Sequence, residues 1–373
     1  MERPASVQRN AGLDALRAAM TVLVVLHHTA LTYGAIGGWY FHEVPADGGV
    51  STKLLILFCT INQAFFMGLF FLIAGYFTPD ALARKGGGRF LGDRVRRLGV
   101  PLLFYTCVLS PLTIMLAQTA RGHAPLATLH YLWIHREVDT GPLWFAQALL
   151  IFSLGYVLWR NVAGAGDRFR RFPSNTVMTA AMLVTGLIAF ILRLAWPVGV
   201  NVFGLQIGYF AGYVVLFAAG CAGASGRWLT EVPDRQRRTW GVIALVCLPI
   251  FPAIELVAPS FAGLGGRSEG GWNLQALTYA FWEPLIAWGI ILWLLRRFAG
   301  GDRRLGPVWT SLSRRAFAIY IIHPPVLVAI AMAWRRVEAP HLLKFAVTGG
   351  LACLACFWIA GLMLRVPTIR RVV

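Results

Sequence analysis

Ten long apolar runs constrain this chain more than any other feature of its sequence. A helix needs about 20 apolar residues to cross the hydrocarbon core of a bilayer. Runs of that length lie at approximately 15–36, 54–78, 98–119, 143–160, 176–196, 204–223, 239–258, 274–296, 315–334 and 342–364. Only 13% of the 373 residues are charged, against roughly a quarter in an average soluble domain. The sequence therefore predicts an all-α polytopic membrane bundle with about ten transmembrane helices.

The basic residues give this bundle a predicted orientation. A net charge of +18 would indicate nucleic-acid binding in a soluble protein, but here the apolar runs divide the basic residues into short clusters. With the basic residues at the ends of runs (Arg160, Arg296, Arg315 and Lys344) counted in the adjoining loops, 25 of the 34 Lys and Arg residues lie in one set of alternate loop segments and 7 in the other, and Arg17 and Arg193 lie within spans. The positive-inside rule places both termini in the cytoplasm. We expect no nucleic-acid partner and a single membrane domain over 1–373.

The six cysteines and the first apolar run carry no processing or redox signal. All six lie inside apolar runs, and only Cys353 and Cys356 show C-x-x-C spacing. Without further ligands, the pair is expected to be packing residues rather than a redox or metal site. The first run lacks a convincing small-residue cleavage site, so we interpret it as a retained helix.

The first span carries an unusual pair of polar residues. Arg17 and His28 are 11 residues apart, so they share one helix face about 16 Å apart along the axis. Asp14, one turn before Arg17, is spaced for an ion pair that would hold the guanidinium at the membrane boundary. Equally, Arg17 could snorkel to the interface and His28 could make a helix–helix contact.

Other spans also contain polar residues at bilayer depth. They are Asn62, Gln63, Gln147, Arg193, Glu255, Glu283 and His323. A single such residue is usually a satisfied interhelical hydrogen bond, whereas several with opposite charges suggest a water-accessible cavity. Pro284 follows Glu283, and Pro324 and Pro325 follow His323. Proline frees a backbone carbonyl and kinks a helix, which suits a site but also a purely structural bend.

A glycine-rich basic segment precedes the third span. It runs KGGGR from Lys85 to Arg89 and is followed by Arg94, Arg96 and Arg97. Arg94 and Arg97 are one turn apart at the foot of the span, a spacing suited to a phosphate. The alternative is ordinary positive-inside charge.

Five short motifs occur in order along the chain. They are LDALR at 13–17 with His28, FFLIAGYF at 70–77, RVRRL at 94–98, LWF at 143–145 and YIIHP at 320–324. Together they resemble the signatures of the acyltransferase-3 family of integral membrane acyltransferases, which includes glycan O-acetyltransferases and glucan succinyltransferases. The chain departs from the family in Ala74, where many members have Ser, and in His27, a second histidine before His28. No hydrolase-like domain follows the last span, so a one-component enzyme is expected.

The resemblance implies O-acylation at a site within the bilayer of a bacterial cytoplasmic membrane. The donor would be a cytoplasmic acyl-coenzyme A, acetyl-coenzyme A in the commonest case, and the acceptor a hydroxyl of an extracytoplasmic or membrane-associated glycan. No permanently bound cofactor or metal is implied.

Candidate residue roles combine the family's motifs with the polar residues of the spans and with the basic segment before the third span. The candidate catalytic set is His28, Arg17, Asp14, Glu283 and His323, and the candidate donor-binding set is Arg94, Arg97, Arg89 and Lys85. His28 is assigned as general base because imidazole titrates near neutrality. Glu283 or Glu255 could orient an imidazole, and direct attack and an acyl-histidine intermediate both stay open. The rival class is a transporter or flippase that uses intramembrane His, Glu and Arg as a relay.

Overall fold

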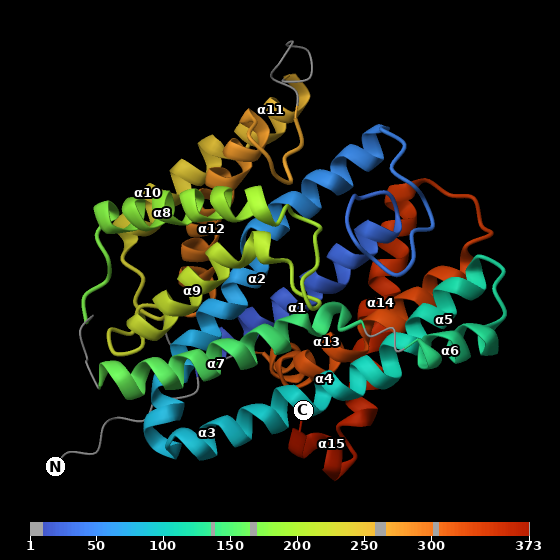
Figure 1. Cartoon of the computed structure of the whole chain (residues 1–373), viewed down its shortest axis with the longest axis horizontal. Coiled ribbons are helices and arrows are strands. Elements are labelled where there is room, and N and C mark those ends of the chain that lie inside the picture. The colour runs from blue at the N-terminus through green and yellow to red at the C-terminus, as the bar shows by residue number, and fades with distance from the viewer. Residues whose placement is uncertain (1–9, 136–138, 165–169, 258–265, 301–305, 373) are drawn as a thin grey trace. The chain divides into compact units, whose positions relative to one another are not determined.

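The computed structural model describes residues 10–135, 139–164, 170–257, 266–300 and 306–372, and these residues are mainly helical (Figure 1). Within these ranges, strand-like pairing is confined to two isolated bridges, Tyr33 with Val44 and Val202 with Leu205. The predicted all-α class is confirmed.

Helices follow one another through the described residues. The N-terminal ones are α1 (Ala11–Thr32), α2 (Val50–Lys85), α3 (Gly87–Arg94), α4 (Val100–Phe104), α5 (Ser110–Ala120), α6 (Pro125–Ile134) and α7 (Trp144–Ala163). The C-terminal ones are α8 (Asn175–Ala195), α9 (Phe210–Gly223), α10 (Asp234–Cys247), α11 (Ile250–Val257), α12 (Leu274–Phe298), α13 (Pro307–Trp334), α14 (His341–Met363) and α15 (Pro367–Val372). Short 3₁₀ turns lie at Gly141–Leu143 (η3) and Ile207–Tyr209 (η4), and π-helical turns at Val95–Gly99 (η1) and Tyr105–Leu109 (η2).

Nine helical runs in the described residues are long and apolar enough to cross a membrane. They correspond to nine of the ten predicted spans, and the predicted polytopic membrane fold is confirmed. The remaining prediction, 204–223, corresponds to a shorter apolar helix, Ile207–Gly223. This helix starts late because Phe203 (φ 52°) and Gly204 (φ 79°) adopt left-handed backbone conformations in a turn closed by the bridge between Val202 and Leu205. The cytoplasmic location of the termini stays a prediction.

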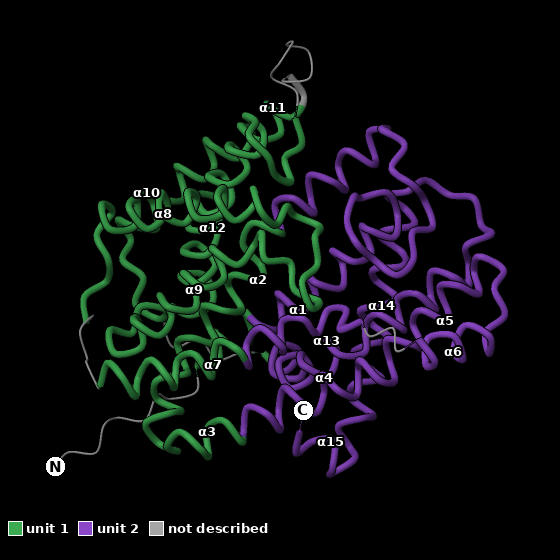
Figure 2. The backbone as a smooth tube through the Cα atoms, in the orientation of Figure 1, with its two compact units in different colours: residues 1–16, 63–92, 151–306 green, residues 17–62, 93–150, 307–373 purple. Residues whose placement is uncertain are grey.

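The chain contacts divide into two compact units (Figure 2). Unit 1 comprises residues 1–16, 63–92 and 151–306, and unit 2 comprises residues 17–62, 93–150 and 307–373. Four helices, α1, α2, α3 and α7, contribute residues to both units. The sequence predicts one membrane domain. The contacts divide this chain into two units, each of which is assembled from three segments that are far apart in the sequence.

Unit 1 contains a close helix contact at the FFLIAGYF motif. A Cβ atom on Gly75 would lie 2.2 Å from the carbonyl oxygen of Phe217, and one on Gly220 would lie 2.1 Å from that of Leu72. The backbones of α2 and α9 thus touch where both helices have glycine, as is common in membrane helix pairs. This close contact explains why position 75 of the motif is a glycine.

In unit 2 the helical run that ends with α5 passes through two π turns. In η1 the N–H of Val100 donates to the carbonyl of Val95, and in η2 the N–H of Ser110 donates to that of Tyr105. Pro101 and Pro111 follow directly, and neither has an N–H to continue the normal α-helical pattern. Such π turns locally widen a helix and often occur near functional sites.

Candidate functional site

Two histidines from opposite ends of the sequence meet in unit 2. His28 lies on α1 and His323 on α13, and Nδ1 of His28 is 3.0 Å from Nε2 of His323. Their rings stack with centroids 5.0 Å apart and an interplanar angle of 22°. His323 is fully buried, whereas His28 is partly exposed. His28 is thus the more exposed of the two residues.

The Tyr-x-x-His-Pro sequence on α13 fixes the orientation of His323. The carbonyl of Tyr320 would normally accept from the N–H of residue 324, but Pro324 has none. Nδ1 of His323 occupies the vacated position, 2.7 Å from the Tyr320 carbonyl oxygen. Because Pro324 has no N–H, the Tyr320 carbonyl is free to accept a hydrogen bond from the His323 ring, and this bond holds the ring.

The contact between His323 Nδ1 and the Tyr320 carbonyl determines which nitrogen of each neutral imidazole carries the hydrogen. A carbonyl oxygen can only accept, so His323 Nδ1 is the donor and His323 Nε2 carries the lone pair. His323 Nε2 then accepts from His28 Nδ1, which leaves Nε2 of His28 as the basic nitrogen. A buried neutral imidazole occupies the orienting position that a carboxylate holds in many His-dependent enzymes.

The connection between α1 and α2 covers His28. Trp39 stacks on the His28 ring with centroids 4.2 Å apart and an interplanar angle of 18°. Its indole Nε1 donates to the hydroxyl of Thr32 over 3.0 Å, and that hydroxyl donates to the His28 carbonyl over 3.1 Å. Trp39 is therefore positioned by the same turn of α1 that carries His28.

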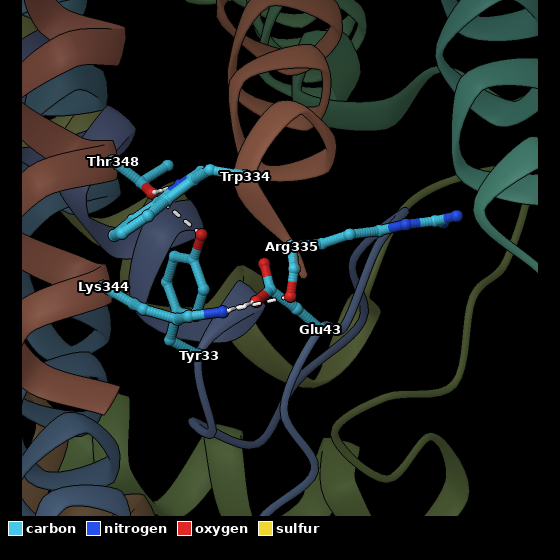
Figure 3. A network of polar contacts seen from close by, with 6 residues as sticks. All are labelled: Tyr33, Glu43, Trp334, Arg335, Lys344 and Thr348. Atoms are coloured by element: carbon cyan, nitrogen blue, oxygen red, sulfur yellow. Dashed lines mark hydrogen bonds and ion pairs between the residues drawn. The ribbon is translucent and has the colours of Figure 1, made fainter. Parts of the chain in front are cut away.

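A buried polar network ties this loop to α13 and α14 (Figure 3). Lys344 forms an ion pair with Glu43 and donates to the carbonyl of Arg335 over 3.3 Å. The Thr348 hydroxyl accepts from Trp334 Nε1 at 3.0 Å and bonds the Tyr33 hydroxyl at 2.8 Å. Only 6% of the Lys344 side chain and 9% of the Glu43 side chain are exposed. The loop that carries Trp39 is thus anchored by a buried charge pair, which we call the Lys344–Glu43 latch.

A second set of contacts holds the Tyr320 side chain. The Tyr320 hydroxyl donates to the carbonyl of Pro142, in the turn that begins α7. Gly141 has φ 45°, and a Cβ there would lie 2.2 Å from the hydroxyl oxygen of Tyr40. Burial raises the pKa of Tyr40 above its ordinary value, so its hydroxyl stays protonated and bonds the Tyr105 hydroxyl at 3.0 Å. The LWF segment therefore lies beside the Tyr-x-x-His-Pro segment.

Glu283, one of the two acids considered as an orienting group, has a different partner. Its carboxylate pairs with the guanidinium of Arg193 inside unit 1, and both residues line a cavity there together with Gln63. Glu255 is exposed near the end of α11. Asn62, Gln147 and His323 belong to unit 2. The polar residues expected to form a cavity are thus distributed over both units.

The basic candidates extend from the end of α2 through α3 to the π turn η1. Lys85 ends α2, and Arg89 lies on α3 in unit 1, both exposed. Arg94 is half-buried and Arg97 is exposed in unit 2. On α1, Asp14 is buried while Arg17, one turn later, is exposed.

Sequence reasoning did not identify Trp39, Glu43 or Lys344. A lysine three residues inside the last apolar run was a usable signal, because a buried lysine normally has a carboxylate partner. Trp39 and Glu43 lie in the segment 37–53 between the first two predicted spans, whose Gly, Pro, Trp and His content suits a loop over a cavity mouth but does not single out either residue.

The sequence of this chain is similar to those of known proteins. The family model described as an acyltransferase domain, acyltransferase-3, matches residues 10–363. Glucans biosynthesis protein C of Escherichia coli K12 is 29% identical over 121 residues, which is 32% of this chain and 30% of that protein. Its counterpart in Escherichia coli O6:K15:H31 is 27% identical over 155 residues, 40% of this chain and 38% of that protein. The matched segments thus cover well under half of the curated relatives' length, and no solved structure matches the chain. With the family model covering nearly all of its residues, this chain belongs to the acyltransferase-3 family.

Proposed function

We propose that the protein is an O-acyltransferase of the bacterial cytoplasmic membrane. It transfers an acyl group, acetyl in the simplest case, from cytoplasmic acyl-coenzyme A to a hydroxyl of an extracytoplasmic or membrane-associated glycan. Family membership supports the reaction class, and the name of the similar Escherichia coli protein supports a glucan-type acceptor. Acyl-coenzyme A is a substrate in this scheme.

The observation that carries the proposal is the hydrogen-bond chain from the Tyr320 carbonyl through His323 to His28. A sugar hydroxyl is a poor nucleophile until its proton is removed, and a neutral imidazole can remove it near neutral pH. The chain leaves Nε2 of His28 with the lone pair needed for that step.

The proposed reaction conserves all atoms and charges. His28 Nε2 accepts the hydroxyl proton as the acceptor oxygen forms a bond to the thioester carbonyl carbon. The carbon–sulfur bond then breaks, and the departing thiolate takes the proton from His28 to give coenzyme A. His323 accepts a hydrogen bond from His28 Nδ1 throughout, which stabilises the imidazolium that forms.

The donor would be held at the basic start of the helical run that contains α3 and α4. Arg94 and Arg97 lie one turn apart there, and guanidinium groups bind phosphates through paired N–H donors. Coenzyme A carries three phosphates that such a site can bind. Arg89 and Lys85 would add to the local positive potential.

The proposal is tested by measuring acyl transfer directly. Membranes that contain the protein are incubated with radiolabelled acetyl-coenzyme A, and mass spectrometry identifies the glycan or lipid that gains the label. We expect label on a hydroxyl-bearing acceptor and none with membranes that contain the His28→Ala variant. Translocation of an unmodified glycan without any acyl label, at normal protein levels, would favour the flippase class and refute the proposal.

A further inference from the structure

A small cavity lies within unit 1, with walls from α2, α8, α9 and α12. Its volume is about 40 Å³, and one water molecule needs about 10–15 Å³ on the same scale. Its polar lining consists of Gln63, Thr185, Arg193, Tyr209, Tyr213 and Glu283. The cavity therefore has room for about three water molecules, or for one hydroxyl-bearing arm of a larger ligand.

Arg193 is the most informative residue of this lining. Its side chain is 1% exposed, its Nε donates to the carbonyl of Gly208 over 3.0 Å, and its Nη2 pairs with Glu283. The guanidinium also lies 4.7 Å from the centre of the Tyr279 ring. Its Nη1, however, has no hydrogen-bond partner among the described residues. Because a buried unpaired N–H costs free energy, an acceptor atom of a bound molecule would be stabilised at Nη1.

The charges around Arg193 restrict the ligand class. Glu283 already neutralises the guanidinium, so an anion would meet a carboxylate as well as a cation and gain little. An apolar ligand would leave Nη1 unpaired. A hydroxyl group can accept from Arg193 Nη1 and donate to a Glu283 oxygen at the same time. The lining thus selects an uncharged hydroxylated ligand.

The size of the cavity limits how much of that ligand it can hold. Tyr209, Tyr213 and Trp288 line the same cavity. Tyr213 stacks on Phe71 with ring centroids 5.0 Å apart, and the Arg193 guanidinium lies 5.4 Å from the centre of the Tyr209 ring, so these two rings pack the wall of the cavity. Since a pyranose is larger than the cavity, only its hydroxyl-bearing arm would enter.

We propose that this cavity binds a hydroxyl of an uncharged sugar, with Arg193 as donor and Glu283 as acceptor. The choice of a glycan rests on the proposed function, but binding needs no acyl donor and is measured without one. The probe is radiolabelled gentiobiose, an uncharged glucose disaccharide, in equilibrium dialysis against the full-length protein in lipid nanodiscs.

Gly212 offers a way to fill the cavity without altering the Arg193–Glu283 pair. It lines the cavity, and a Cβ there meets no heavy atom within 4 Å. Gly212→Leu on α9 also improves helix propensity, so the variant should fold. Gly155 on α7 is a matched control, because it is exposed, has equal space for a Cβ and does not line the cavity. We expect Gly212→Leu to weaken gentiobiose binding about tenfold or more, and Gly155→Leu to leave it unchanged.

Arg193→Lys tests the donor directly, because a lysine keeps the positive charge beside Glu283 but removes Nη1. We expect about tenfold weaker binding, with an affinity for gentiobiose that salt does not change. Absence of gentiobiose binding, or equal affinity in Gly212→Leu, would overturn the inference. A salt-sensitive preference for glucose 6-phosphate would also overturn it, in favour of an anion site. Binding that behaves as expected without acyl transfer would leave this inference standing and refute the proposed function.

Discussion

His27 and His28 are neighbours on α1 but differ in what their rings contact. His28 bonds His323 and stacks on Trp39, whereas the buried His27 meets His28 edge-on with centroids 5.6 Å apart. We expect His28→Ala to insert normally and to lower acyl transfer on the order of 10²-fold or more. His27→Ala should keep most of its activity per inserted molecule. The measurement is acyl label incorporated, normalised to the amount of protein in the membrane.

The same comparison distinguishes chemistry from packing. Equal loss of protein in both variants would indicate that the two histidines serve packing alone. A well-inserted and fully active His28→Ala variant would exclude His28 as the base.

His323 is predicted to act through His28 rather than on substrate, because it is fully buried and bonds His28 Nδ1. His323→Leu removes the acceptor that fixes the His28 tautomer, and we expect acyl transfer to fall roughly tenfold or more. A glutamine has a carbonyl oxygen that can accept the same hydrogen bond. His323→Gln should therefore restore part of the rate, with the acceptor KM unchanged in both variants. Identical rates in His323→Leu and His323→Gln would contradict a positioning role.

Much of this site could be predicted from single residues, but their pairing could not. His28 and His323 are identifiable because imidazoles are rare in apolar spans. Their hydrogen bond depends on how α1 and α13 rotate about their axes, which side-chain packing decides. For this reason Glu283 or Glu255 was considered as the orienting group, whereas the group that contacts His28 is His323. The freed Tyr320 carbonyl was recognisable from the spacing of Tyr320 and Pro324 alone.

The loop between α1 and α2 depends on the Lys344–Glu43 latch. Lys344→Met would leave the buried Glu43 carboxylate without its cation, at a cost of about 3–5 kcal/mol. We expect a lower unfolding temperature in nanodiscs and faster maleimide labelling of a cysteine introduced at Gly38, which is exposed in this loop. Lys53→Met, at an exposed lysine on α2, is the matched control and should change neither value.

A double variant shows whether the charge pair itself is responsible. Glu43→Gln combined with Lys344→Met removes both charges, so it should recover most of the lost stability. A double variant that is less stable than either single variant would show that the latch acts through something other than its charges.

The start of the third span is predicted to contribute to donor binding. Arg94→Ala and Arg97→Ala should raise the KM for acyl-coenzyme A, and the activity lost should grow with ionic strength. Lysine at either position should rescue only partly, because a point charge replaces a bidentate fork. Arg96, an exposed member of the same cluster, provides the control Arg96→Ala. An unchanged KM in both test variants would assign these arginines to positive-inside charge alone.

Most helices could be predicted from hydropathy and length, because a bilayer requires long runs with internally satisfied backbone groups. The departures occur where local backbone chemistry intervenes. The turn at Phe203 and Gly204 shortens the run before α9, and the π turns η1 and η2 occur before Pro101 and Pro111. Apolar periodicity does not report such backbone detail. The helix α6 inside the expected loop 120–142 was missed because ten residues are too few for a span.

The grouping of the chain into two units could not be predicted from the sequence. Unit 1 joins the start of α1 to residues 63–92 and 151–306, and no linker or change in composition marks these boundaries. The grouping arises from contacts between distant segments, such as the glycine contact between Gly75 on α2 and Phe217 on α9. Only the three-dimensional packing of small residues determines which helices meet in this way.

The orientation of the whole chain in the membrane is a testable consequence of its charge distribution. The 25-to-7 asymmetry of basic residues predicts that both termini and residues 79–97 face the cytoplasm, with 120–142 outside. Ala83 and His123 are exposed positions in these two segments, so cysteines introduced there should be accessible to a reagent. On a background without the six native cysteines, an impermeant maleimide should label His123→Cys in intact cells. It should label Ala83→Cys only after the membrane is permeabilised. The reverse pattern would invert the orientation and would place the Arg94 and Arg97 cluster on the side opposite to cytoplasmic acyl-coenzyme A.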